Sequence, residues 1–370
     1  MFEEKTHSSS LKRSMVTVAA LLCIGAVGLW FSSFFVLPNE GGKGTAEEST
    51  LETSDLTGEL VLTLIAKDRA AQDIPGVPQG YIYNVQRDSL ERIDNGTLFS
   101  LQHTYSSNGI YAAFLGLAND SQQDLSAPGS INAHVFLASN TEQGGNNVIR
   151  LSTEESFAKA VPVVSNTGEV LYSSLPQGNP SAIDPRFSNV TRADWWEIRH
   201  IAQNGDERIL THGTYPHWVN DTTFVYLRDD GMYQYDTDSN EEHVLIPLRA
   251  GVLSSSSMID VSDDGSLIAW SIADQGKLYV FEAGNWERSE GAEVRTRGVI
   301  ENTYGFWPVI SPNGRYIALQ TVSTVYEDTL TNPQPKIEFF STHTLQPLSK
   351  QIDLDSFEQL QMFVTDWKRL

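Results

Sequence analysis

The stretch SPNGRYIALQTV (311–322) joins a tight turn to a strand. Its first four residues are of the types that favour reverse turns, because Asn and Gly tolerate a left-handed backbone and Ser bonds to neighbouring peptide groups. The residues that follow are mostly aromatic, β-branched or aliphatic, as strands prefer. The stretch therefore predicts a β-hairpin, with a second strand formed by the apolar residues before Ser311.

The same turn-and-strand pattern recurs along the chain, as SSNGIYAAFLG (106–116), SNTGEVLYSSL (165–175), NDTTFVYLRD (220–229) and SDDGSLIAWSI (262–272). A sixth copy, QMFVTDW, begins at Gln361 and is truncated. When the apolar residues before each turn are aligned, one position is held by His103, Pro162, Pro216, Ile259 and Pro308. An internal repeat of about 45 to 60 residues indicates a repeat architecture.

A second hairpin pattern alternates with the first, with aromatic residues in its first strand and apolar residues after its turn. Its six copies span residues 80–93, 133–151, 196–210, 231–246, 276–287 and 336–348. Two hairpins per repeat make four strands, which is typical of β-propeller blades.

Strands from the two ends of the repeat region are expected to complete one blade. The stretch TGELVLTLIAK (57–67) matches the second strand of an inner hairpin, and the unpaired outer hairpin 80–93 follows it. We therefore predict an all-β, six-bladed β-propeller over residues 59–370, whose last blade takes one strand from the C-terminus and three from residues 59–93. Such closure removes the free sheet edges that invite aggregation.

The S-x-[DN]-G turn followed by a short apolar strand, as in SPNGRYIALQ and SDDGSLIAW, resembles the repeat of TolB-type six-bladed propellers. The same repeat forms the propeller of prolyl oligopeptidases. The resemblance covers five or six blades and implies a bacterial envelope protein. The copy NDTTF lacks the glycine, and the last copy is short.

The N-terminus carries an apolar run that predicts a membrane anchor. Residues 15–37 contain no Asp, Glu, Lys or Arg and are long enough to cross a bilayer as a helix. A cleaved signal peptide would have a shorter apolar region and a small-residue cleavage site. Lys12 and Arg13 precede the run, so we expect a cytoplasmic tail (1–14) and an extracytoplasmic C-terminal part. Residues 38–58 are polar and predict a flexible linker.

Charge and cysteine content limit the partners. The net charge of −22 argues against nucleic acid, and against adhesion to anionic lipid by anything except the helix 15–37. The single cysteine, Cys23, lies in the predicted helix, so we expect no disulfides. We expect the propeller to be monomeric.

Motifs that carry chemistry are sparse. The sequence has no G-x-S-x-G elbow and no phosphate-binding glycine loop. The D-x-D-x-N run from Asp236 to Asn240 starts like a calcium loop, but Glu241 and Pro247 stand where that loop needs Gly and Glu. His212 and His217 lack neighbouring ligands for zinc. We therefore expect no resident metal or cofactor and assign no catalytic residue.

The most informative candidates are positional. Segments that lead into the first strand of a blade line the mouth of a propeller channel, and here they carry aromatic and histidine side chains. These candidates for binding a ligand or partner are His103, His212, Tyr215, His217, Tyr304 and Trp307. The same side chains suit packing between blades almost as well.

Three functions remain open from the sequence. The first is a membrane-tethered, non-catalytic module that binds an envelope protein, a peptide or a glycan. The second is a hydrolase or lyase that uses a cation at the channel mouth, which rests on analogy between folds alone. The third is a sensor, which the short tail 1–14 disfavours. Converging carboxylates at the mouth would favour the enzyme, and an aromatic funnel would favour the binding module.

Overall fold

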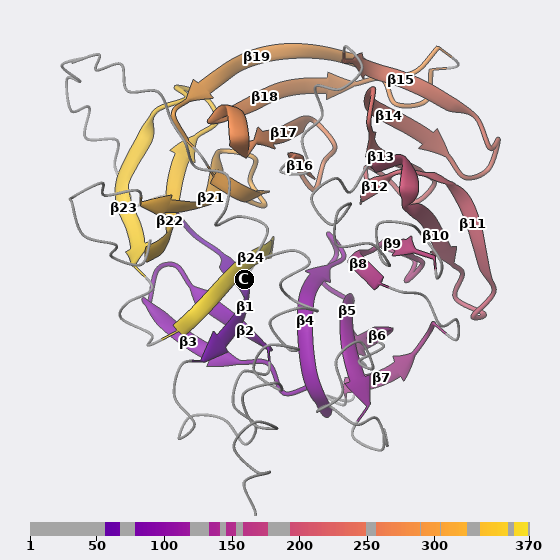
Figure 1. Ribbon diagram of the computed structural model, residues 1–370, viewed down its shortest axis with the longest axis horizontal. Coiled ribbons are helices and arrows are strands. Elements are labelled where there is room, and N and C mark those ends of the chain that lie inside the picture. The colour runs from indigo at the N-terminus through magenta and orange to yellow at the C-terminus, as the bar shows by residue number, and fades with distance from the viewer. Residues whose placement is uncertain are drawn as a thin grey trace, which may run out of the picture.

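The chain forms a six-bladed β-propeller, as Figure 1 shows. The computed structural model describes residues 56–66, 78–118, 133–140, 146–152, 158–176, 193–248, 257–288, 290–303, 305–323, 334–353 and 359–368. Six antiparallel sheets of four strands surround a central axis, and two short 3-10 turns accompany them in these ranges, η4 (Ala193–Trp195) and η5 (Ala273–Gln275). The predicted all-β, six-bladed architecture is confirmed.

In blades 1 to 3 the four strands follow one another from the axis outward in the order below. Blade 1 consists of β24 (Gln359–Lys368), β1 (Glu59–Ala66), β2 (Gln79–Asn84) and β3 (Ser89–Arg92). Blade 2 consists of β4 (Thr97–Tyr105), β5 (Tyr111–Ala118), β6 (His134–Asn140) and β7 (Asn146–Arg150). Blade 3 consists of β8 (Ala158–Val164), β9 (Val170–Leu175), β10 (Glu197–Ile201) and β11 (Glu207–His212).

The remaining blades follow the same order. Blade 4 consists of β12 (Thr214–Trp218), β13 (Thr223–Arg228), β14 (Gly231–Asp236) and β15 (Glu242–Pro247). Blade 5 consists of β16 (Ser257–Val261), β17 (Leu267–Ile272), β18 (Lys277–Gly284) and β19 (Glu293–Glu301). Blade 6 consists of β20 (Gly305–Ile310), β21 (Tyr316–Ser323), β22 (Gln334–Ser341) and β23 (Pro347–Asp353).

Blade 1 closes the ring with strands from both ends of the described chain. β24 pairs antiparallel with β1, with Leu60 opposite Trp367. The Trp367 side chain is 2% exposed, its ring packs edge-on against Phe339 of blade 6, and its Nε1 donates to the Thr57 carbonyl at 3.1 Å. The predicted one-plus-three closure is therefore present, and one tryptophan ties it to the neighbouring blade.

The outer hairpins follow the predicted ranges closely in blades 1 to 4. In blade 6 the outermost strand β23 begins at Pro347 and runs to Asp353, beyond the predicted end at residue 348. The largest departure is in blade 5. There the sequence pattern placed both strands within 276–287, whereas the outermost strand β19 begins at Glu293. The first strand, β18, ends at Gly284, and the turn Asn285–Arg288 precedes β19. The charged composition of β19 hid it from a search for apolar strands, because an outermost strand faces solvent.

Four inner strands contain a bulge with a left-handed residue. The register of β4, β8, β12 and β20 shifts where Gln102, Val161, Tyr215 and Trp307 have φ between 50° and 55°. Each residue directly precedes the position aligned by sequence as His103, Pro162, Pro216 or Pro308. Bulky side chains seldom adopt this conformation, and bulges often redirect a side chain near a functional site.

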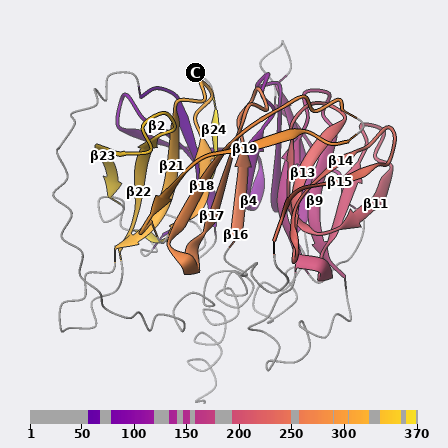
Figure 2. The ribbon, with the colours of Figure 1, turned by 90° about the horizontal axis from the view of Figure 1, so that it is seen from above.

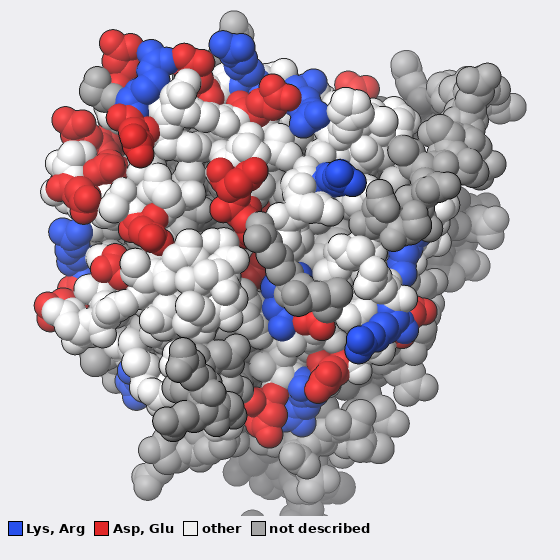
Figure 3. All heavy atoms as spheres, turned by 180° about the vertical axis from the view of Figure 1, so that it is seen from behind, with Lys and Arg blue, Asp and Glu red and all other residues white. Residues whose placement is uncertain are grey.

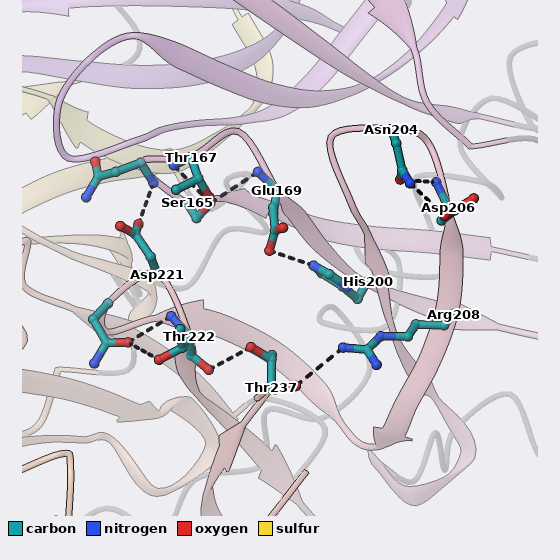
Figure 4. A network of polar contacts seen from close by, with 12 residues as sticks. Ser165, Thr167, Glu169, His200, Asn204, Asp206, Arg208, Asp221, Thr222 and Thr237 are labelled. Atoms are coloured by element: carbon teal, nitrogen blue, oxygen red, sulfur yellow. Dashed lines mark hydrogen bonds and ion pairs between the residues drawn. The ribbon is translucent and has the colours of Figure 1, made fainter. Parts of the chain in front are cut away.

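Polar contacts fasten strands within a blade and join the turns of neighbouring blades (Figure 4). In blade 3, His200 of β10 contacts Glu169 at 3.0 Å. The turn of blade 3 then bonds to the turn of blade 4, because the Asn166 amide donates to Asp221 at 3.1 Å. These contacts hold one end of the strands together around the axis.

Seen edge-on, the strands of all blades cross the thickness of a disc (Figure 2). The turn from each inner strand to the second strand lies at one face, and so does the turn from the third strand to the outermost one. The predicted anchor 15–37 and most of the linker 38–58 lie outside the described residues. Within the described part of the chain, no helix has the length and apolar character needed to cross a membrane.

Candidate functional site

Two aromatic rings from non-adjacent blades meet at the axis. Tyr215 belongs to β12 of blade 4 and Trp307 to β20 of blade 6, and their ring centroids are 6.1 Å apart in an edge-to-face arrangement. Blade 5 lies between these blades around the ring, so two rings this close must both point inward. Met258 of blade 5 completes the contact by accepting the Trp307 amide on its sulfur at 3.3 Å.

The bulges explain why these rings reach the axis. A regular strand would turn alternate side chains toward the two neighbouring blades, whereas the extra residue of a bulge changes the direction of one of them. Tyr215 and Trp307 are themselves the left-handed residues of their bulges. Val161 of blade 3 is a third such residue, and it belongs to the same apolar cluster as Met258 and Trp307.

Polar groups follow further along the same inner strands. His217 Nδ1 of blade 4 lies 3.3 Å from Asp260 Oδ1 of blade 5, and their side chains are 15% and 17% exposed. Solvent therefore reaches this pair. Asp366 of blade 1 also interacts with Asp260 electrostatically, although blade 6 separates the two blades. We call Tyr215, His217, Asp260, Trp307 and Asp366 the axis cluster.

Both carboxylates also join blades. The other oxygen of Asp260 accepts the Ile310 amide of blade 6 at 2.6 Å. Asp366 accepts the Tyr105 amide of blade 2 at 2.5 Å and the Trp367 amide at 2.7 Å. Each aspartate therefore bonds to the next blade around the ring.

Burial controls the protonation of the axis cluster. It raises the pKa of Asp366 to about 7, with the Tyr105 amide opposing the shift and Asp263 adding to it. Burial also raises the pKa of Asp260 well above its usual value, and it lowers the pKa of His217 to about 4. The close contact of His217 with Asp260 therefore joins two groups whose charged forms burial disfavours.

The raised pKa of Asp366 predicts a loss of stability with increasing pH. The unfolded chain releases this proton near pH 4 and the folded chain near pH 7, so the folded state binds the extra proton between these values. The contribution of Asp366 is therefore complete below pH 4 and is lost as pH rises through 7, by up to about 4 kcal/mol. Urea unfolding of the wild type and of Asp366→Asn, from pH 4.5 to 8.5, measures the difference.

The difference in unfolding free energy between wild type and Asp366→Asn should fall from pH 4.5 to about pH 7 and level off at higher pH. Buried histidines such as His103 and His217 have lowered pKa values and cost stability at acidic pH, but they are present in both proteins and cancel. Asp238→Asn, in an exposed turn, is the matched control and should give a flat difference. If the difference in unfolding free energy were independent of pH for Asp366→Asn as well, folding would not raise the pKa of Asp366.

His103, the first predicted site residue, lies away from the axis cluster. Its side chain is 1% exposed, its ring stacks on Phe114 at 4.8 Å, and a Cβ at Gly80 would overlap it. Asn95 Nδ2 lies 3.1 Å from its Nε2. His103 therefore packs between blades 1 and 2.

The other predicted residues divide between the axis and the rim. Tyr215, His217 and Trp307 come together at the axis as described. His212 is exposed at the end of β11, the outermost strand of blade 3, and pairs in register with Glu197. Tyr304 lies outside the described residues.

Asp260 and Asp366 were not singled out from the sequence. For Asp260 the alignment already contained the signal, because Asp260 follows Ile259 just as His217 follows Pro216. Asp366 lies in the truncated copy QMFVTDW, where a bulge of β24 shifts it out of that column. The next position of the repeat therefore indicates Asp260 but not Asp366. The candidates from the sequence were instead aromatic residues and histidines.

The axis cluster offers hydrogen-bonding, acidic and aromatic groups in one place. Figure 3 shows the face that is hidden in Figure 1, with Asp and Glu side chains near its middle. Among the described residues, no group of three or more His, Cys, Asp or Glu side chains is arranged to hold a metal ion. The described arrangement therefore suits contact with a polar or positively charged group.

Comparison with known proteins supports the architecture. No family model matches the sequence, and no curated protein sequence matches it. The solved structure of TolB from Acinetobacter baumannii is similar, with a TM-score of 0.54 and 14% identity over 85% of this chain and 67% of that chain. That likeness establishes the fold alone.

Two enzymes of similar fold give weaker matches. An oligogalacturonate lyase in complex with manganese has a TM-score of 0.44 and 9% identity over 74% of this chain and 70% of that one. The periplasmic gluconolactonase of Pseudomonas aeruginosa has a TM-score of 0.42 and 9% identity over 84% of this chain and 98% of that one.

Proposed function

We propose that this protein is a membrane-tethered, extracytoplasmic module that binds an envelope protein, a peptide or a glycan at the propeller axis. The observation that carries the proposal is the meeting of Tyr215 and Trp307 from non-adjacent blades, beside the solvent-reached pair His217 and Asp260. Three bulged inner strands supply residues to this apolar and aromatic contact. Backbone strain of this kind is typical of binding sites.

The chemistry of the axis cluster indicates the kind of contact. Aromatic rings stack on sugars and on apolar or cationic side chains, while carboxylates and imidazole bond to polar groups. The exposed Asp263, in the turn after β16, interacts electrostatically with both Asp260 and Asp366. With a net charge of −22, the domain favours a partner that presents positive charge.

The proposed membrane tether rests on the amino-acid sequence of the N-terminal part. The apolar run 15–37 would hold the propeller at a membrane, and the polar segment 38–58 would let it reach about 25 Å from the lipid surface. A C-terminal alkaline phosphatase fusion is expected to be active in a bacterial host. An inactive fusion, together with a fluorescent cytoplasmic reporter at the same position, would reverse the proposed topology.

Site-specific photo-crosslinking in cells tests the binding site. A photoreactive amino acid in place of the exposed Asp263 should form a discrete adduct, because this turn lies beside the axis cluster. The same replacement at Asp206, exposed in the β10–β11 turn, is the matched control and should form none. Binding of the purified protein to a glycan array tests for a carbohydrate ligand.

A substitution in the axis cluster tests whether the adduct at position 263 depends on that cluster. His217→Gln keeps a polar side chain next to Asp260 and should weaken the adduct at position 263 while the melting temperature changes little. Adducts of equal strength at 263 and 206, or an adduct insensitive to His217→Gln with no glycan bound, would contradict the proposal.

A cation-dependent hydrolase or lyase is the second candidate. The observation in its favour is that Asp260 of blade 5 and Asp366 of blade 1 interact electrostatically across blade 6. Titration of the protein with calcium or manganese, followed by melting temperature, separates the two functions. A cation-dependent rise that Asp263→Asn reduces would favour the enzyme.

A further inference from the structure

A hollow with a basic lining lies between blades 5 and 6, away from the axis cluster. Its volume is about 370 Å³, which is within the usual range for small-molecule sites. It is formed by β19, by the turn between β20 and β21, and by the turn between β22 and β23. The lining residues are Arg297, Gly314, Arg315, Tyr316, Ser341, Thr342 and His343.

The three segments are held firmly against one another. Thr342 joins the two turns with two bonds, from its amide to the Arg315 carbonyl at 2.9 Å and from its hydroxyl to the Gly314 carbonyl at 2.8 Å. β19 approaches the second turn closely at Gly298, where a Cβ would overlap the Leu345 side chain. The shape of the hollow is therefore set by these contacts between the segments rather than by the long side chains that line it.

The donors in the hollow are oriented by their own hydrogen bonds. Arg297 Nη2 lies 3.2 Å from His343 Nδ1. A guanidinium can only donate, so Nδ1 accepts and the neutral imidazole carries its proton on Nε2, where it can donate in turn. Ser341 Oγ accepts the amides of His343 and Thr344, both at 3.2 Å, which leaves its hydroxyl hydrogen to donate.

The charge of this hollow is opposite to that of the whole protein. The lining contains two arginines and no acidic residue, in a chain with a net charge of −22. Arg297 Nε lies 3.7 Å from Glu282 Oε1, a distance longer than a charge-assisted hydrogen bond. A second anion near the Arg297 guanidinium would thus gain favourable electrostatic energy.

We propose that this hollow binds a phosphate-type oxyanion, either as inorganic phosphate or as the phosphomonoester end of a larger ligand. Arginine guanidinium groups match the tetrahedral oxygens of phosphate with paired N–H donors, and the histidine and serine supply further donors. The volume exceeds what a single phosphate fills, so the monoester is the better fit. This site is independent of the binding proposed at the axis.

Isothermal titration of the full-length protein in a mild detergent at low ionic strength tests the proposal, with inorganic phosphate and glycerol phosphate as probes. Arg297→Gln and Arg315→Gln should each weaken binding by about tenfold to a hundredfold, since each removes charge-assisted hydrogen bonds. Arg295→Gln is the matched control, because Arg295 lies on the same strand, is 79% exposed and is absent from the lining. It should leave the affinity unchanged.

The two probes distinguish the sources of the phosphate group. Equal affinities would identify inorganic phosphate as the ligand, and tighter binding of glycerol phosphate would identify a phosphomonoester. Either result supports the site, provided that the loss follows Arg297 and Arg315. No heat of binding with either probe at 10 mM, or an equal loss in Arg295→Gln, would overturn it.

Discussion

A chain that lacks residues 359–370 is expected to lose its folded propeller and to aggregate. The deletion removes β24, the innermost strand of blade 1, which pairs along the length of β1. Val364 and Trp367 are buried in the core shared with blade 6. Truncation of a buried tryptophan alone costs about 3–5 kcal/mol, a large part of the 5–15 kcal/mol that stabilises most domains, and the deletion removes the rest of the strand as well.

The deletion also breaks contacts that do not belong to blade 1. Asp366 accepts the Tyr105 amide of blade 2, and β24 lies against both β4 and β20. Without β24 the ring is open, and β1 presents an unpaired edge that can pair with another chain. Size-exclusion chromatography and circular dichroism should therefore show aggregates or an unfolded chain.

Deletion of residues 1–55 is the matched control for this experiment. It keeps every described strand and the Thr57 carbonyl that bonds to Trp367. We expect a monomer with a cooperative melting transition. If the chain without 359–370 melts as cooperatively as this control, the closing strand is not needed for the fold.

Gly80→Ala is expected to destabilise the propeller by about 3 kcal/mol, through a single methyl group. A Cβ on Gly80 would overlap the ring of His103, which is 1% exposed. The ring cannot move away easily, because it stacks on Phe114 and its Nε2 meets Asn95. Urea unfolding of the purified domain measures the change.

A double-mutant cycle assigns the loss to this contact. Gly80→Ala combined with His103→Ala should be less destabilised than the sum of the single variants by about 1–2 kcal/mol, because the new methyl enters the space that the ring leaves. Gly284→Ala is the control, since a Cβ there meets nothing within 4 Å, and it should change stability by less than about 0.5 kcal/mol. Additive single effects would show that His103 does not fill the space above Gly80.

The axis cluster illustrates how far the repeat could be used to predict a site. Tyr215, His217 and Trp307 were selected by their place before or within aligned strands, and the structure brings them together at the axis. His103 is aligned with Pro216 and Pro308, one residue after the left-handed position that Gln102 holds in blade 2, and it packs between blades. A column of an alignment does not state which way its side chain points, because a one-residue bulge reverses that direction.

The sequence by itself determined the architecture of this protein. Turn residues and alternating apolar strands recur in phase, and these local patterns were sufficient to predict six blades and the pairing of β24 with β1. Only the tertiary structure decided which side chains reach the axis and which protons they hold. The left-handed backbone of Tyr215 and Trp307 and the raised pKa of Asp366 both arise where several blades meet. Such properties depend on burial and on neighbours from distant parts of the chain, which no local pattern records.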